Sequence, residues 1–387
     1  MKLSAIRNDK SALDILVSDV SQCLSVLWGE NIYGAYYEAL SKRISCVGRL
    51  HIKGSNNKTV SVIVKHLPID CYPAQTVTDV SQELREEQVC YQFLQSTRDS
   101  FPLFAQMYAF DDRGFMILED LSGSEKEEEE ELDVLASRLG YTFAALHLAT
   151  FKKVDIYNNM RKAAGLPAPM NDPRAYSLAA HRRRYQLGAA TVKDYCNILN
   201  VALPDTYNQH IDLIEAEMEN PGIFHCFIHD DLANARQVIN RDAQFHLIDF
   251  ENAKCSHALL DLCKPLAGKF EMLLEDGEFF YANPNFPDSF IDEYRKSLYT
   301  LGRKHFDQQY WDFSLTQALL YHCLALIGKL IEISSDRQLR KDFSFDLFNI
   351  ISRHVYLLNK LETFTPIKGV LSQLLQSIQN PEINESP

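Results

Sequence analysis

The segment His229–Ala253, HDDLANARQVINRDAQFHLIDFENA, places aspartates in an apolar frame and decides how the rest of the chain is interpreted. A carboxylate beside buried strands costs free energy unless a cation or hydrogen bonds compensate it. The preceding run IFHCFIH (223–229) predicts a strand that delivers Asp231 at its end. ARQVIN and QFHLIDF, joined by the turn RDA, predict a hairpin that ends near Asp249. Two carboxylates at two strand ends indicate a site for a divalent cation.

Phosphoryl transfer uses two carboxylates that have different roles. One carboxylate orients the attacking hydroxyl and accepts its proton, and a second holds Mg²⁺ on the phosphate oxygens, usually with an amide side chain. Protein kinases supply these groups from H-R-D…N and D-F-G. Here His229 and Asp231 are followed by an amide and then by Asp249-Phe250. We therefore expect Asp231 to be the catalytic carboxylate and Asp249 to bind the metal.

Composition narrows the class of protein. The chain has 387 residues, of which 46% are hydrophobic and 24% charged, as in a globular protein with a core. A net charge of −13 argues against a nucleic-acid partner and weakly favours cationic acceptors. The nine cysteines are scattered and lie mostly in apolar segments, which favours reduced thiols. We recognise neither a signal peptide nor an apolar run of membrane-spanning length, so we expect a cytoplasmic protein without a membrane partner.

The secondary-structure pattern predicts an α+β fold. Residues 41–67 contain two β-rich runs, 81–96 have helical spacing, and 104–121 contain two further β-rich runs. Beyond Leu121 an acidic run precedes a mostly helical remainder. We predict an N-terminal helical extension, a small β-rich N-lobe, and a larger helical C-lobe with a β-hairpin insert. Their expected bounds are 1–35, 36–121 and 122–387.

The motifs, taken in order, resemble the aminoglycoside phosphotransferase/choline kinase superfamily, whose fold is protein-kinase-like and two-lobed. Its members carry H-G-D-x-x-x-x-N, then I-D-F/W-E/D, then an aspartate that opens a helix. This chain has His229–Asp231, Ile248–Glu251 and Asp261 at these places. The resemblance extends over roughly residues 36–270, and it depends on the order and spacing of motifs that are weak individually.

The resemblance implies an ATP site in the N-lobe. It supplies a phosphate-binding lysine, a helix glutamate that pairs with it, a hinge strand that faces adenine, and a strand-turn-strand that covers the nucleotide. Lys65 stands at the position of the phosphate-binding lysine, and Glu87 at that of the helix glutamate. The hinge strand contributes Glu119, Asp120 and Leu121, and the strand-turn-strand contributes Ser41. Glu86 is a close competitor of Glu87, and the spacing to Tyr91 favours Glu87.

Two departures from the family pattern leave alternatives open. Asp230 stands where the family has glycine, and Arg236 stands where the metal-binding asparagine is expected. In one alternative Gln237 (or Asn234) supplies the second Mg²⁺ ligand, as in the maltokinase and glucosamine kinase branch. In the other, Arg236 occupies the position and the protein is a weakened, pseudokinase-like binding module.

The sequence thus predicts an ATP- and Mg²⁺-dependent phosphotransferase that acts on a hydroxyl of a small molecule. Sugars, aminoglycosides and amino alcohols are all compatible acceptors. The net charge favours a cationic acceptor and the glutamine-type loop favours a sugar, and neither decides. The basic stretch AHRRRYQL (180–187) predicts a solvated helix face. Its alternative role is to contact an anionic group on a substrate or partner.

Overall fold

The computed structural model describes most of the chain. The described residues are 9–40, 46–54, 59–74, 81–122, 131–174, 177–231, 237–267, 271–273, 279–281, 288–301, 308–334, 343–363 and 365–379. The chain divides into two compact units. The first comprises residues 1–128 with 156–166 and 238–251, and the second comprises the remainder. The domain bounds expected from the sequence remain a prediction.

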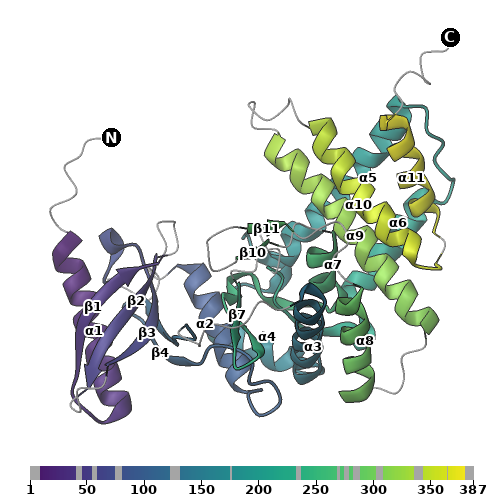
Figure 1. Ribbon diagram of the computed structural model, residues 1–387. Coiled ribbons are helices and arrows are strands. Elements are labelled where there is room, and N and C mark those ends of the chain that lie inside the picture. Colours follow the sequence, from purple (N-terminus) through teal and green to yellow (C-terminus); the bar gives the residue numbers. More distant parts are fainter. Residues whose placement is uncertain are drawn as a thin grey trace. The chain divides into compact units, whose positions relative to one another are not determined.

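The first unit is built on a five-stranded antiparallel sheet in the order β1-β2-β3-β5-β4 (Figure 1). Its strands are β1 (Ile32–Ala39), β2 (Cys46–Gly54), β3 (Thr59–His66), β4 (Met107–Asp111) and β5 (Phe115–Glu119). β3 is central, and its sequence TVSVIVKH is rich in β-branched residues that suit a buried strand. Its penultimate residue, Lys65, is paired with Val47 and Met116.

The helices α1 (Asp9–Trp28) and α2 (Gln82–Gln95) pack against this sheet. α4 (Val154–Ala163), which begins just before the first unit's middle segment, contacts α2 through Tyr157 and Arg161. Leu16, Val20 and Leu24 of α1 are buried in one core with Leu50 and Val62 of the sheet. The residues predicted to be an N-terminal extension therefore share the core of the β-rich unit.

The second unit is mostly helical, as predicted. Its helices are α3 (Leu132–Thr150), α5 (Leu178–Ile198), α6 (Tyr207–Glu219), α7 (Leu259–Ala267), α8 (Ser289–Leu301), α9 (Gln308–Ser334), α10 (Phe343–Lys360) and α11 (Pro366–Gln379). The β-rich part followed by a helical part confirms the α+β expectation.

Short strands carry the candidate site. β6 (His225–Ile228) confirms the predicted strand before Asp231, and it pairs with β9 (Lys254–His257), which the sequence pattern did not reveal. β7 (Val238–Arg241) and β8 (Gln244–Leu247) form the predicted hairpin, which is grouped with the first unit. β10 (Glu271–Leu273) and β11 (Phe279–Tyr281) form a further two-stranded sheet.

The long helix α9 corrects one expectation. Its segment Tyr310–Ile333 is long and apolar enough to cross a membrane, with a mean hydropathy of 1.3. The expectation that no apolar run approaches this length is therefore wrong. However, 72% of the segment's most apolar window is buried inside the protein. A buried core helix meets the same criterion, so length and composition are weak evidence for a membrane span.

Two glycines let α5 and α9 approach each other closely. A Cβ atom at Gly188 would lie 1.8 Å from the carbonyl oxygen of Leu324, and one at Gly328 would lie 1.9 Å from that of Arg184. Both obstacles are backbone atoms, which cannot move aside as the end of a flexible side chain can. The two helices are therefore held in a fixed register, which positions the side chains that they present.

We expect Gly328→Ala to lower the free energy of unfolding by about 1–3 kcal/mol, because the added methyl group overpacks a backbone contact. Urea denaturation measures this change. Gly369→Ala is the matched control, since a Cβ atom at this position in α11 meets nothing within 4 Å. The control should be about 0.5–1 kcal/mol more stable than the wild type, because alanine favours helix over glycine. Equal stability of Gly328→Ala and the wild type would contradict the close-packing argument.

Candidate functional site

A buried ion cluster in the first unit joins three residues predicted from the sequence. The Lys65 ammonium lies 2.6 Å from Glu87 Oε1 and 2.5 Å from Asp249 Oδ1. Lys65 comes from β3, Glu87 from α2, and Asp249 follows β8. Lys65 is 9% exposed and Glu87 is 3% exposed, so both charges are largely removed from solvent. A buried cation held between two carboxylates is therefore built into the end of β3.

The electrostatics of this cluster follow from burial. Burial alone would lower the pKa of Lys65, yet Glu87 and Asp249 raise it well above its usual range. Burial raises the pKa of Glu87 to about 7 against the opposing effect of Lys65, and Asp249 adds to the rise. Lys65 therefore stays charged near neutral pH, while Glu87 can take up a proton.

The structure separates Glu87 from its competitor Glu86. Both glutamates are buried on α2, but Glu86 Oε2 lies 2.5 Å from Nη1 of Arg161 in α4. Glu87 is the one that reaches Lys65. The two consecutive buried glutamates thus pair with two different cations. Spacing in the sequence favours Glu87 as the partner of Lys65 but does not decide between the two glutamates.

The predicted hinge residues follow directly from β5. Glu119 Oε1 accepts a hydrogen bond from Nη1 of Arg241 at 3.1 Å. Asp120 Oδ2 accepts one from Nε of Arg49 at 2.8 Å. Leu121 is buried. Both carboxylates are thus engaged within the protein, so any contact of this segment with a ligand would come from its backbone.

Asp231 follows β6 in the second unit. Its Oδ2 accepts hydrogen bonds from Nε2 of Gln237 at 3.1 Å and from Nδ2 of Asn252 at 3.0 Å. Asn252 was not predicted, although it directly follows the motif Ile248–Glu251. Two amides thus fix Oδ2 of Asp231. Because the carboxylate is planar and rigid, they also fix the direction of Oδ1.

The amide oxygen of Gln237 has different surroundings. Gln237 is buried, and its Oε1 has no hydrogen-bond partner among the residues that the structure describes. A buried amide oxygen without a partner is costly unless something else binds it. Amide oxygens are ligands for hard cations such as Mg²⁺. Gln237 therefore offers one oxygen of the kind that a magnesium ion binds.

Three sequence-predicted or competing residues lie outside the described parts of the chain. Asn234 and Arg236 fall in 232–236, and Ser41 falls in 41–45. Their roles stay predictions. Of the three candidates for the second metal-ligand position, Gln237 is the one that the structure describes, and its Oε1 has no hydrogen-bond partner among the described residues.

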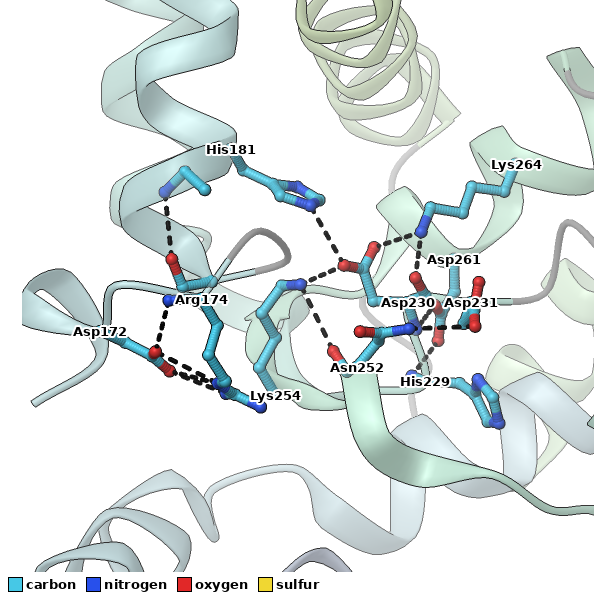
Figure 2. Close-up of polar contacts among 12 residues, drawn as sticks. Asp172, Arg174, His181, His229, Asp230, Asp231, Asn252, Lys254, Asp261 and Lys264 are labelled. Carbon is cyan, nitrogen blue, oxygen red and sulfur yellow. Dashed lines mark hydrogen bonds and ion pairs between the residues drawn. The ribbon is translucent and has the colours of Figure 1, made fainter. Parts of the chain in front are cut away.

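Asp261 fixes the loop that carries Asp231. Its two carboxylate oxygens accept hydrogen bonds from the backbone N–H groups of His229 and Asp230, at 2.8 and 2.7 Å (Figure 2). His147 Nε2 lies 3.1 Å from the same carboxylate. Asp261 is fully buried. Asp261 thus holds the backbone of the loop.

Asp230, which stands where the family resemblance led us to expect glycine, adopts a backbone conformation that glycine favours. Its φ is +56°, in the left-handed region, which aspartate tolerates better than most residues. Figure 2 shows its carboxylate surrounded by Lys254, Lys264 and His181. Lys264 Nζ lies 3.0 Å from Oδ1, and His181 Nε2 lies 3.4 Å from Oδ2. Although burial opposes ionisation, the two lysines hold the pKa of Asp230 well below its usual range.

A cavity of about 210 Å³ borders this loop within the second unit. Asp230 and Asp231 line it on one side, and one face of α9 lines it on another. That face presents His322, Ala325, Leu326 and Lys329, which are spaced as neighbours on a helix. The candidate catalytic carboxylate therefore lines a pocket of small-molecule size.

A buried histidine pair links His322 of the cavity wall to His354 of α10. His354 Nδ1 donates to the carbonyl oxygen of Ile350 at 2.7 Å, because a carbonyl oxygen can only accept. Burial lowers the pKa of His354 to about 4, so the ring is neutral near pH 7 and its Nε2 accepts. His322 Nδ1 must then donate across the 3.0 Å contact between the rings. This leaves Nε2 of His322 as a hydrogen-bond acceptor.

Buried neutral histidines make stability depend on pH. The pKa of His354 is depressed in the folded protein, so the unfolded chain binds more protons as the pH falls below about 6.5. Its contribution to stability is therefore present above that pH and is lost as the pH falls toward 4. We expect a loss of about 1 kcal/mol between pH 7 and pH 5.5 from this residue.

Urea denaturation at these two pH values tests the expectation. His354→Gln keeps an acceptor for His322 and should reduce the pH-dependent loss of unfolding free energy by about 1 kcal/mol. His210→Gln, at a partly exposed position of α6, should leave the loss unchanged. An unchanged pH dependence in His354→Gln would show that this ring does not carry the effect.

Comparison with known proteins finds similar solved structures, at low sequence identity. No protein-family model and no curated protein sequence matches the chain. The similar solved structures include aminoglycoside phosphotransferases, choline or ethanolamine kinases and an amicoumacin kinase.

Three of them illustrate the similarity. The amicoumacin kinase hAmiN, in complex with AMP-PNP and Ca²⁺, is 14% identical over 94% of this chain and 99% of its own, with a TM-score of 0.49. The Plasmodium vivax ethanolamine kinase is 12% identical over 92% and 96%, with a TM-score of 0.48. The phosphotransferase APH(2")-IIa, in a complex with streptomycin and ATP, is 14% identical over 89% and 96%, with a TM-score of 0.45.

Proposed function

We propose that this protein is an ATP- and Mg²⁺-dependent phosphotransferase that acts on a hydroxyl group of a small molecule. The observation that carries the proposal is the buried cluster of Lys65, Glu87 and Asp249. A lysine on the third strand, paired with a helix glutamate, binds nucleotide phosphates in protein kinases, and an aspartate after a later strand holds their metal. A purely structural ion cluster does not require this combination of elements.

In the proposed reaction, Asp231 orients the acceptor hydroxyl and accepts its proton. The acceptor oxygen forms a bond to the γ-phosphorus, the bond from that phosphorus to the β-phosphate oxygen breaks, and ADP leaves. Gln237 and Asn252 hold Oδ2 of Asp231, so the other oxygen is positioned to take the proton. Lys65 binds the α- and β-phosphates, and the backbone of 119–121 contacts adenine.

Asp249 and Gln237 are the proposed magnesium ligands, with Asn234 as the alternative amide. In the hairpin, Val238 pairs with Leu247, so Gln237 and Asp249 both lie just beyond its open end. The oxygen of Gln237 that is not used by Asp231 has no partner among the described residues. When bound, Mg²⁺ neutralises charge on the phosphate oxygens. The two proposed ligands thus lie next to the ends of two strands, β7 and β8, that pair with each other.

Chain connectivity supports a common role for Asp231 and Asp249. Asp249 is only three residues before Asn252, and such a segment spans at most about 10 Å. Asn252 donates to Asp231. The residue that would hold the metal and the residue that would take the proton are thus linked through one short segment.

The runner-up is a pseudokinase-like module that binds a nucleotide or another ligand with weakened catalysis. The observations that favour it are Asp230 in the glycine position and Arg236 in the amide position. The first is accommodated, because Asp230 adopts the left-handed backbone and is neutralised by two lysines. This accommodation favours the enzyme over the module.

Thermal denaturation with AMP-PNP, with and without Mg²⁺, followed by assays of ADP release with a panel of small alcohols, tests the proposal. The panel includes sugars, aminoglycosides and amino alcohols. We expect a metal-dependent shift and ATP-dependent turnover with a subset of acceptors. Gln237→Leu should raise the Mg²⁺ concentration for half-maximal effect about tenfold, since one oxygen ligand is lost. A metal-dependent shift without turnover on any acceptor would favour the binding module instead.

A further inference from the structure

The wall of the cavity beside Asp231 carries more cations than carboxylates. Arg184 of α5, Lys264 of α7 and Lys329 of α9 line it, against Asp230 and Asp231. This contrasts with the chain as a whole, whose net charge is −13. The cavity lining thus concentrates positive charge in a strongly acidic protein, and a further carboxylate, Glu332, pairs with Arg184.

The two carboxylates offset these cations only in part. Asp230 is contacted by Lys264 and by a further lysine behind the wall, Lys254, so its single charge faces two ammonium groups (Figure 2). Asp231 is hydrogen-bonded to neutral amides and is reserved for the acceptor hydroxyl.

Lys329 lies in positive surroundings. Burial, and then the neighbouring Lys264 and Arg184, lower the pKa of Lys329, and Asp231 and Asp230 only partly oppose this. Arg184 Nε donates to Glu332, one turn from Lys329 on α9, at 2.6 Å, and this contact fixes the guanidinium group. An anion that enters the cavity would therefore reduce the repulsion among three cations.

The cations are held on a rigid support. A Cβ atom on Gly328 would collide with the carbonyl oxygen of Arg184, so the backbones that carry Arg184 and Lys329 touch. Along α9, His322 and Lys329 are two helical turns apart, which is about 10 Å. The cavity thus has a catalytic carboxylate on one wall and fixed cations from α5 and α9 on others, with the length of a small molecule available.

We propose that the acceptor is a small alcohol that carries an anionic group, a carboxylate or a phosphate, which binds to Arg184, Lys264 and Lys329 while the hydroxyl meets Asp231. This inference rests on the proposed phosphotransferase function and specifies its substrate class. Nε2 of His322 supplies an acceptor for a second hydroxyl or an amine of the same molecule. The basic stretch of α5, for which a solvated face was the first expectation, thus contributes one buried arginine to the site.

Isothermal titration calorimetry of the full chain with inorganic phosphate, acetate and choline, without nucleotide or Mg²⁺, tests the charge preference directly. We expect phosphate or acetate to bind and choline not to bind, and the tighter of the two anions identifies the group. Lys329→Met should weaken anion binding at least tenfold. Lys193→Met, at an exposed position of α5, is the matched control and should leave it unchanged. If Lys329→Met fails to fold, Lys329→Gln is a second neutral variant.

Two further arms assign the anion to its site. Lys65→Met should keep anion binding, because Lys65 belongs to the other unit. Loss of binding in Lys65→Met and retention in Lys329→Met would place the anion at the nucleotide phosphates and overturn the inference. Absence of anion binding to the wild type, or preferential binding of choline, would also overturn it.

Activity assays separate this inference from the proposed function. Glycerol, glycerate, glycerol 3-phosphate and choline are compared as acceptors with ATP and Mg²⁺. Turnover with glycerol or choline alone would uphold the phosphotransferase and overturn the anionic acceptor. Lys329-dependent anion binding without turnover on any alcohol would support the cationic cavity and count against the phosphotransferase.

Discussion

Replacement of Asp231 by asparagine is expected to lower kcat for ATP-dependent transfer about 10³-fold, within the range that a positioned general base contributes. The variant is nearly isosteric. Gln237 and Asn252 both donate to Oδ2, so an amide oxygen at position 231 can keep both hydrogen bonds. What is lost is the second carboxylate oxygen, which is the one that would accept the proton.

Nucleotide binding should survive in this variant, because the Lys65 cluster contains no part of Asp231. Calorimetry with AMP-PNP and Mg²⁺ measures this, and steady-state assays measure kcat. Asp242→Asn is the matched control, since that side chain is 87% exposed at the turn of the hairpin. If Asp231→Asn retained wild-type turnover, another group would have to be the base.

The second large effect is expected for Lys65→Met. Removal of the ammonium group should weaken nucleotide binding and lower turnover at least 100-fold, since the lysine would contact the phosphates. It also leaves Glu87 and Asp249 without their shared cation. Removing one partner of a buried ion pair costs about 3–5 kcal/mol when the other charge stays buried.

Protonation of Glu87 limits this cost. The pKa of Glu87 is already about 7 in the presence of Lys65, and it rises further without it. A raised pKa makes the glutamate's contribution to stability decline as the pH rises through that value. The destabilisation by Lys65→Met should therefore be larger at pH 8 than at pH 6, by about 1 kcal/mol.

Urea denaturation at both pH values measures the difference in stability. Lys53→Met, at an exposed position of β2, should change neither stability nor nucleotide affinity. Equal destabilisation of Lys65→Met at the two pH values would show that Glu87 does not take up the proton.

The sequence predicted the parts of the site that lie within or beside regular elements. Lys65 was predicted from the resemblance to a known family, whose phosphate-binding lysine lies on a strand, and TVSVIVKH is such a strand; Asp231 was predicted because IFHCFIH is a strand that ends beside it. Spacing on α2 favoured Glu87 but could not exclude Glu86, because both face the interior and only the position of Arg161 separates them.

The cavity could not be predicted in the same way. Arg184, Lys264 and Lys329 lie on three helices that are far apart in sequence, and no local pattern marks them as neighbours. Asn252 was missed for a related reason, since its partner Asp231 lies across a hairpin. The close packing of α5 on α9 depends on single glycines, whose effect appears only when the partner backbone is known.

The left-handed aspartate at position 230 has a consequence for how this loop can vary among related proteins. Substitution of Asp230 by glycine alone would leave Lys254 and Lys264 without the carboxylate that both contact. Loss of either lysine alone would weaken the compensation of a fully buried charge. Substitution of Asp230, Lys254 or Lys264 alone is therefore unfavourable. We expect homologues to keep all three residues or to have replaced them as a set.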